Sequence, residues 1–278
     1  MNTGQTYNYN SDMSMQMNQQ INGQNIDIVM NLNGNLAFVV KKFANDTYLL
    51  EAAYKKLAMS MEMPQATITF SSDHPAGSDP ISMLFGQIID QPFMISMSSR
   101  GEIVGVNGLE KLFQSMIDSL NLPEQQKQQV RSQMQQSFGN EAFISNFQLG
   151  WIVFPEQAVS QGSSWEFTTT MTSTGVPIEV NTTHTYLGMQ DGKWHIRSTS
   201  TLSKPDDQEW SNFNGLKAKI TVNGTQEGDI LLDSSSGWVQ QSTVDQQLEM
   251  TFTIPPNDQL PNGLTIPMTM KTKAYTSN

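Results

Sequence analysis

Three histidines are the residues of this sequence that could act as a general base or as a metal ligand: His74, His184 and His195. Catalysis requires such groups to be held together by partners. The three lie far apart and none stands in a metal-ligand motif, although His184 and His195 flank a predicted hairpin turn at residues 189–194 and could be cross-strand neighbours. The chain also lacks a Gly-x-Ser-x-Gly elbow, a Walker loop and a dinucleotide fingerprint. We therefore expect no enzymatic activity, no catalytic residues and no cofactor.

Methionine provides the sharpest chemical signal. Two triplets alternate with polar residues, so that each places three thioethers on one face of a strand. They are Met13, Met15 and Met17, and Met59, Met61 and Met63. Thioethers are soft ligands that Cu(I) selects, but alternating methionines also suit a core or an adaptable ligand pocket. Because no cysteine or nearby histidine completes a coordination sphere, we assign no metal ligands and keep copper binding as an alternative.

A polar loop at residues 73–80 contains Asp73 and Asp79, whose carboxylates are hard ligands of the kind that calcium accepts. Their spacing matches no EF-hand. Because surface loops are polar in any case, a solvated loop is the preferred interpretation.

Composition limits the classes of partner. A formal net charge of −11, from 15 Lys and Arg against 26 Asp and Glu, repels phosphate backbones, so we expect no nucleic-acid binding. The absence of cysteine excludes disulfides and suits an exported protein. No apolar run approaches the ~20 residues of a membrane span. Met1 leads almost directly into a strand pattern without a signal segment, which leaves two alternatives: a cytoplasmic protein, or an exported protein whose signal has been removed.

The first 107 residues show the period of two that is typical of half-buried strands. Apolar residues share one parity from Tyr7 to Met17 and polar residues share the other. Turn signals at residues 20–24, 33–35 and 45–46 then predict an antiparallel meander. In the strand that follows, the apolar parity shifts, which predicts a bulge near Lys55 and Lys56.

The apolar period changes to 3.6 residues after Leu109, which predicts an amphipathic helix. Its stripe consists of Leu109, Leu112, Phe113, Met116, Ile117 and Leu120. A Gln-rich segment at residues 123–138 and a short segment at 141–147 predict two more helices. We expect the first helix to lie on the concave side of a sheet as a plug or lid, because its apolar stripe must be buried against something.

A second strand-rich region begins at Gly162-Ser163-Ser164-Trp165, which repeats the order of Gly4-Gln5-Thr6-Tyr7. The hairpin signals that follow also repeat, which indicates an internal duplication. The predicted fold class is mainly β (α+β), with two related antiparallel β-sheet halves and a central helical insert. The predicted boundaries are 1–107 for the first β-rich half, 108–150 for the helical insert and 151–278 for the second half.

Four features of the sequence carry a resemblance to a known family: the two Gly-x-Ser/Thr-aromatic openings, the strand pair around Tyr48 and Tyr54, the helix after Gly105-Val106-Asn107-Gly108, and the segment from Phe154-Pro155-Glu156 to Trp165. In these features the sequence resembles an uncharacterised bacterial family of envelope lipoproteins, a domain of unknown function. The resemblance implies export to the periplasm or outer membrane, and a possible lipid anchor on the native N-terminus, but no catalytic residues. The twisted sheet with its helical plug also resembles, more loosely, lipoprotein carriers that hold acyl chains in a half-barrel.

The function that these patterns favour is non-catalytic binding or transport of an apolar or amphipathic molecule, such as a lipid, outside the cytoplasm. The expected ligand-binding residues are methionines of the two triplets and apolar residues of the first helix: Met13, Met15, Met17, Met59, Met61, Leu112, Phe113 and Met116. We expect the first triplet to be largely buried. The alternatives are an envelope structural or interaction protein without a pocket, and a copper-binding protein. The sequence leaves the oligomeric state and protein partners open.

Overall fold

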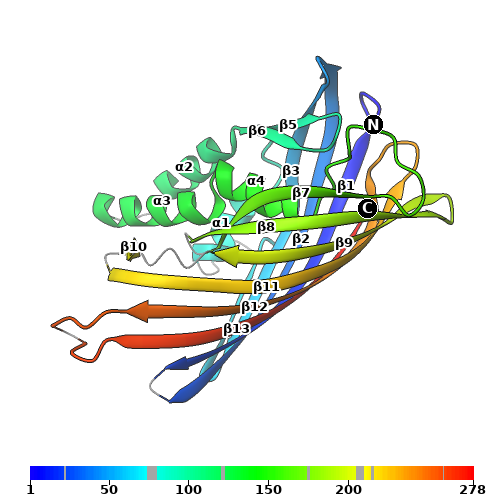
Figure 1. The fold of residues 1–278 in the computed structure, drawn as a ribbon. Helices are drawn as coiled ribbons and strands as arrows, with labels where there is room; N and C mark the ends of the chain where they lie inside the picture. Colours follow the sequence, from blue (N-terminus) through cyan, green and yellow to red (C-terminus); the bar gives the residue numbers. More distant parts are fainter. Residues whose placement is uncertain are drawn as a thin grey trace.

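The structure is a computed structural model that describes residues 1–21, 23–73, 80–119, 123–173, 176–204, 210–213, 216–258 and 260–278. Strands dominate, and four helices occur within these residues (Figure 1). The strands of the first region are β1 (Thr6–Ile21), β2 (Gln24–Ala44), β3 (Thr47–Met63), β4 (Ala66–Ser71), β5 (Phe93–Ser98) and β6 (Ile103–Asn107). The helices are α1 (Pro80–Ile88), α2 (Leu109–Ser119), α3 (Glu124–Phe138) and α4 (Asn140–Leu149). The remaining strands are β7 (Ser164–Ser173), β8 (Val176–Gln190), β9 (Lys193–Lys204), β10 (Ser211–Phe213), β11 (Leu216–Asp233), β12 (Val239–Ile254) and β13 (Leu264–Ser277).

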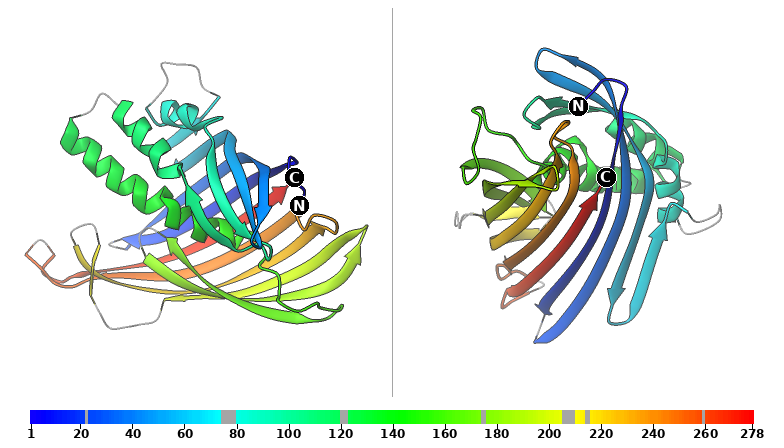
Figure 2. Two further views of the ribbon diagram at one scale, coloured as in Figure 1. Left: turned by 90° about the horizontal axis from the view of Figure 1, so that it is seen from above. Right: turned by 90° about the vertical axis from the view of Figure 1, so that its right-hand side faces the viewer.

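All strands belong to one antiparallel arrangement with the order β6-β5-β3-β2-β1-β13-β12-β11-β9-β8-β7, while β4 pairs with β3 and β10 with β11. The first and last strands, β1 and β13, pair from Asn10 and Ser277 to Gln19 and Met268. This pairing joins the two strand-rich regions into one large curved sheet (Figure 2). One sheet therefore replaces the two separate sheets of the sequence prediction.

The turn predicted at residues 33–35 is wrong, because these residues lie within strand β2. The strand runs unbroken for 21 residues through Asn33, Gly34 and Asn35. Asn33 donates a hydrogen bond to Asp12, and Asn35 donates one to Asn10 on the neighbouring strand. These cross-strand bonds satisfy the amides within the sheet, so an Asn-Gly pair that favours a turn in isolation stays extended.

The predicted bulge in β3 is confirmed. The partner of Asn35 is Lys56, and the partner of Leu36 is Tyr54, so Lys55 has no opposite residue. Because the extra residue shifts the phase, Leu50 and Ala52 before it share the same face of the sheet as Met59 and Met61 after it.

The two faces of the sheet differ in polarity. In β9, Ile196, Ser198, Ser200 and Leu202 are buried, whereas Arg197, Thr199 and Thr201 between them are exposed. The first set belongs to the concave, inner face and the second to the outer face. Lys271 and Lys273 of β13 are likewise exposed on the outer face.

Helix α4 bridges the two edges of the sheet, because it contacts both β6 and β7. Figure 1 shows the helices at one end of the sheet and the long strands β1, β2, β12 and β13 extending beyond them. The helices predicted at residues 109–120, 123–138 and 141–147 are confirmed as α2, α3 and α4, with Leu120 outside the described residues. No described helix is long and apolar enough to cross a membrane.

Two apolar clusters hold the fold together. The first lies under the helices and centres on Trp238, Phe38 and Phe93, all 2% exposed or less. The Trp238 ring stacks on Tyr7 at 4.7 Å and meets the edge of Trp151 at 4.6 Å. The second cluster lies on the inner face further along the strands and consists of Met171, Ile178, Val180, Leu202, Val222, Leu248 and Met270.

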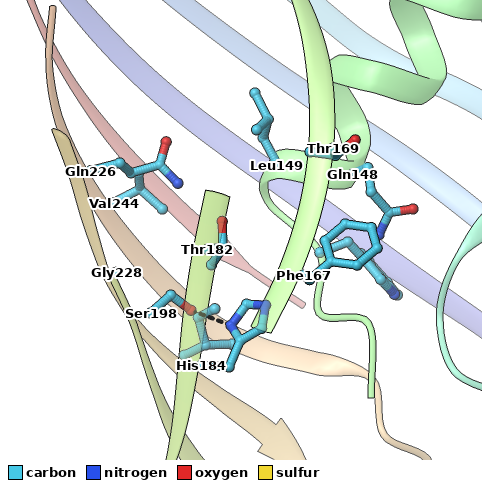
Figure 3. A pocket seen from close by; sticks show the side chains of 12 residues that line it. Gln148, Leu149, Phe167, Thr169, Thr182, His184, Ser198, Gln226, Gly228 and Val244 are labelled. Atoms are coloured by element: carbon cyan, nitrogen blue, oxygen red, sulfur yellow. Dashed lines mark hydrogen bonds between the residues drawn. The ribbon is translucent and has the colours of Figure 1, made fainter. Parts of the chain in front are cut away.

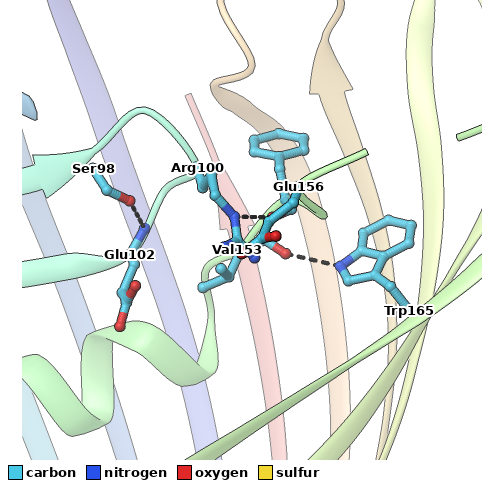
Figure 4. A network of polar contacts seen from close by, with 7 residues as sticks. Ser98, Arg100, Glu102, Val153, Glu156 and Trp165 are labelled. Atoms are coloured by element: carbon cyan, nitrogen blue, oxygen red, sulfur yellow. Dashed lines mark hydrogen bonds and ion pairs between the residues drawn. The ribbon is translucent and has the colours of Figure 1, made fainter. Parts of the chain in front are cut away.

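A connecting segment after α4 crosses from the first sheet region to the second. The Arg100 side chain donates hydrogen bonds to the Phe154 carbonyl at 2.7 Å and to the Glu156 carboxylate at 3.1 Å, and the Trp165 indole donates one to the Val153 carbonyl at 2.8 Å (Figure 4). A side chain at Gly101 would place its Cβ 2.4 Å from the Ile152 carbonyl oxygen. The segment is therefore tightly held between the β5–β6 turn and β7.

The two strand-rich regions share local features that the predicted duplication would produce. Gly4 and Gly162 both have positive φ and donate to the carbonyls of Val40 and Tyr186, respectively. Each acceptor is followed by a register shift in its hairpin. These features support the duplication, which stays a prediction. Superposition of at least three consecutive strands of the two regions would test it. The predicted boundaries at residues 107 and 150 also stay predictions.

Candidate functional site

One line of opposing residues crosses the inner face of the sheet from β7 to β4, and its side chains change from polar to apolar about halfway. We call it the central row. Antiparallel pairing places its members opposite one another in the order Phe167, Thr182, Ser200, Gln226, Gln246, Thr272, Met15, Met30, Met61, Ile68. Five successive hydrogen-bonding side chains on β8 to β13 are thus followed by apolar ones on β1 to β4.

The methionine side chains of the central row are neither fully buried nor fully exposed. Met15, Met30 and Met61 are half-buried, as are Met13 and Met17 on the same strand as Met15. Met15 and Met17 pack against the second cluster. The first triplet is therefore less buried than the sequence predicted, because the helices cover only the other end of the inner face.

In the polar part of the central row, Ser200, Gln226 and Gln246 are buried, while Thr182 and Thr272 are half-buried. Gln246 donates from its amide to the Gln226 side-chain oxygen at 2.9 Å, and the Thr182 and Ser200 hydroxyls lie 2.8 Å apart. Gln226 is 6% exposed and Gln246 is 9% exposed. The Thr272 hydroxyl oxygen, at the junction with Met15, is buried without a hydrogen-bond partner among the described residues.

A cavity of about 20 Å³ lies between the end of α4 and this polar part (Figure 3). Its lining includes the polar residues Gln148, Thr169, Thr182, His184, Ser198 and Gln226. The volume accommodates about one water molecule. It is too small for a drug-sized ligand.

His184 lies beside this cavity, next to the central row. Its Nδ1 is 2.8 Å from the Ser198 hydroxyl, and its ring is 5.3 Å from that of Trp165. Burial lowers the pKa of His184 from 6.5 to about 4, so the ring is neutral at neutral pH. The remaining residues that line the cavity are uncharged, so no carboxylate there orients the imidazole as in a catalytic triad.

His195 does not face His184, contrary to the cross-strand arrangement that the hairpin turn suggested. The partner of His184 is Ser198, while His195 pairs with Gly188. The His195 Nε2 is instead 2.9 Å from the Asp229 carboxylate. The register places the two histidines on opposite faces of the sheet, so they cannot share a ligand.

The remaining predicted ligands are spread across the fold. Asp73 forms an ion pair with Lys56 at 2.7 Å, while His74 and Asp79 lie outside the described residues. Within the described ranges, no three His, Cys, Asp or Glu side chains are grouped to hold a metal ion.

The structure separates the predicted binding residues into two groups. Leu112, Phe113 and Met116 of α2 pack in the first cluster, where Met116 is only 3% exposed. The methionines of β1 and β3, namely Met13, Met15, Met17, Met59 and Met61, lie on the inner face further along the strands. Helix α2 contacts α1 and α3. Its apolar stripe thus joins a packed core rather than the methionine surface.

Sequence reasoning missed Met30 and the polar part of the central row. Met30 stands alone between Val29 and Asn31 and forms no triplet. Gln226, Gln246 and Thr272 lie in stretches where polar residues occupy both parities, so alternation did not mark them as inward-facing.

Comparison with known proteins identifies a family. Residues 45–239, more than half of the chain, match DUF6263, a family of unknown function. The chain belongs to this family. No curated protein matches the sequence. The DUF6263 match spans β3 to the start of β12 and therefore includes the four described helices and every residue that lines the cavity except Val244.

Among solved structures, a lipovitellin structure described by its lipid–protein interactions has 12% identity and a TM-score of 0.45 over 98% of this chain. This chain spans about a quarter of the lipovitellin chain, 25%. An outer membrane channel from Pseudomonas putida F1 has 8% identity and a TM-score of 0.20, covering 99% of this chain and 96% of the channel. OccK7 (OpdD) from Pseudomonas aeruginosa has 8% identity and a TM-score of 0.24, and the match covers 98% of this chain and 99% of the OccK7 chain. All three TM-scores lie below 0.5.

Proposed function

We propose that this member of the DUF6263 family is a non-catalytic binding protein that holds an apolar or amphipathic molecule, such as a lipid, on the methionine-rich part of its inner face. The observation that carries this proposal is the half-buried state of Met15, Met30 and Met61. A packed core would bury these side chains, whereas a face that functions only in water would be polar like the outer face.

Methionine suits such a surface physically. Its unbranched side chain has three rotatable bonds and a polarisable sulfur, so a methionine surface adapts to ligands of different shape. Met13, Met17 and Met59 flank the central row on the same face and extend this surface. The ligand would gain affinity mainly by covering apolar area.

The chemistry of the described residues supports a role without catalysis. The one buried histidine, His184, contacts the hydroxyl of Ser198, and the cavity beside them has room for about one water molecule. A nucleophile in that position has no space for a substrate. We accordingly propose no catalytic residue.

The proposal places the protein outside the cytoplasm, in the periplasm or as an outer-membrane lipoprotein. The absence of cysteine and the low content of charged residues, 15%, support this location. Fractionation of the native host, with mass spectrometry of the mature N-terminus for an attached lipid, tests it.

A carboxylate on the methionine surface should weaken the binding of an apolar ligand. In Met61→Asp, an apolar ligand must desolvate the new charge, so we expect the affinity for an apolar fluorescent dye to fall at least about 10-fold. Because Met61 is half-buried, the free energy of unfolding should fall by only about 1 kcal/mol. Dye titration and urea unfolding of the same samples separate the two effects.

The matched control is Met189→Asp, because Met189 is 56% exposed. This variant should bind the dye like the wild-type protein. If the wild-type protein binds neither dye nor lipid, the carrier role is wrong, and a structural or interaction role in the envelope becomes the better explanation.

Copper binding is a second candidate, and the register of the central row favours it. Met15, Met30 and Met61 stand opposite one another on three neighbouring strands, where directly opposite Cβ atoms are about 4.5–5.5 Å apart. Three flexible thioethers at this spacing can converge on one soft cation such as Cu(I).

Met30→Leu distinguishes this candidate from lipid binding, because leucine preserves the apolar volume and removes the sulfur. If the row binds Cu(I), the variant should lose at least about 10-fold in Cu(I) affinity, measured by competition with a chromogenic chelator, and should keep its affinity for the dye. Equal Cu(I) affinity in the wild-type protein and the variant would exclude this row as the site.

A further inference from the structure

The inner face around the central row carries no formal charge at neutral pH. The row on one side consists of Trp165, His184, Ser198, Gly228, Val244, Ala274, Met13, Leu32, Met59 and Phe70. The row on the other side consists of Thr169, Val180, Leu202, Gly224, Leu248, Met270, Met17 and Ile28. Neither contains Asp, Glu, Lys or Arg, and burial keeps His184 neutral by lowering its pKa to about 4.

The charged residues of the same strands lie on the other side of the sheet. Asp245 and Lys273 stand opposite each other and form an ion pair at 3.3 Å on the outer face. An ionised headgroup on the inner face would therefore lose its hydration without gaining a counter-charge, which is costly.

The junction of the central row offers a hydrogen bond to an uncharged group. Thr272 stands between Gln246 and Met15, and its hydroxyl oxygen lacks a partner among the described residues. Such a group gains free energy when a ligand supplies a donor or acceptor. Met15, its partner on β1, has a flexible side chain that can move aside for a ligand.

The apolar part of the row begins at the next strand and continues in one direction. From Thr272 to Ile68 the row crosses four strand-to-strand intervals, a distance of roughly 19 Å at the usual spacing of about 4.8 Å. An acyl chain laid across the strands from Thr272 would thus contact Met15, Met30 and Met61 in succession.

We propose that the ligand is an uncharged amphiphile, a single acyl chain with a hydroxyl-bearing headgroup, and that the headgroup hydrogen-bonds to Thr272 beside Gln246 while the chain covers Met15, Met30 and Met61. This inference rests on the proposed binding function and adds the class of ligand and its orientation.

Binding of decanoyl monoglycerol and of decanoate at pH 8 tests the headgroup, because the two share an acyl chain and differ in charge. The wild-type protein should bind the monoglyceride at least about 10-fold more tightly than the ionised acid. Thr272→Val should weaken monoglyceride binding by about 3- to 10-fold, the effect of one hydrogen bond, and leave the affinity for an apolar dye unchanged.

Thr269→Val is the matched control, since Thr269 is exposed on the outer face of the same strand. It should bind the monoglyceride like the wild-type protein. Decanoate bound as tightly as the monoglyceride, or a Thr272→Val variant with unchanged monoglyceride affinity, would overturn the inference while dye binding still supports the carrier role. If neither the dye nor the amphiphiles bind, the binding function fails together with the inference.

Discussion

Trp238→Ala should lower the free energy of unfolding by about 3 to 5 kcal/mol, the range for truncating a large buried aromatic side chain. The Trp238 side chain is 1% exposed. It stacks on Tyr7, meets Phe38 and Trp151 edge to face, and donates from its indole nitrogen to the Asn8 carbonyl at 2.9 Å. The variant therefore loses packing between the two strand-rich regions and the hydrogen bond to the Asn8 carbonyl. Urea unfolding followed by circular dichroism measures the effect.

The matched control is Trp210→Ala, because Trp210 is 41% exposed. This change should alter the free energy of unfolding by no more than about 0.5 kcal/mol. A similar loss in both variants would mean that Trp238 is not part of the principal core.

Acidification from pH 7.5 to 4 should cost the folded state about 3 kcal/mol through His184. Its pKa is lowered from 6.5 to about 4 by burial, and each pKa unit corresponds to about 1.4 kcal/mol. The unfolded chain binds a proton below pH 6.5 while the folded chain resists it. The stability associated with neutral His184 is therefore fully present above pH 6.5 and is lost as the pH falls toward 4.

His184→Gln should flatten this part of the pH profile, because glutamine bears no titrating group and can still hydrogen-bond to Ser198. His195→Gln, a change on the outer face, should still lose stability between pH 7.5 and 4 as the wild-type protein does. Parallel profiles for the wild-type protein and His184→Gln between pH 7.5 and 4 would contradict the assignment to His184.

Asp233 affects stability in a lower pH range. Hydrogen bonds from Ser235 and Ser236 lower its pKa from 3.8 to about 2, so the stability that the ionised Asp233 contributes is lost only below pH 3.8.

Sequence by itself determined the local elements, because they depend on the spacing of apolar side chains along a few residues. Alternation predicted β1 and the apolar parity of Met13, Met15 and Met17, and the phase shift predicted the bulge at Lys55. The 3.6-residue stripe likewise predicted α2. These patterns show which side of each strand or helix is buried, and they can be read without knowing which element packs against that side.

Only the tertiary structure decided which strands became neighbours. Pairing of β1 with β13 connects residues 249 to 267 positions apart and turns two predicted halves into one sheet. Local propensity carries no information on such pairing. It is this register that places Met30 between Met15 and Met61, and Thr272 between Gln246 and Met15. Helix α2 shows the same limit, because its stripe required an apolar partner but could not specify that a packed core, rather than the methionine surface, would provide it.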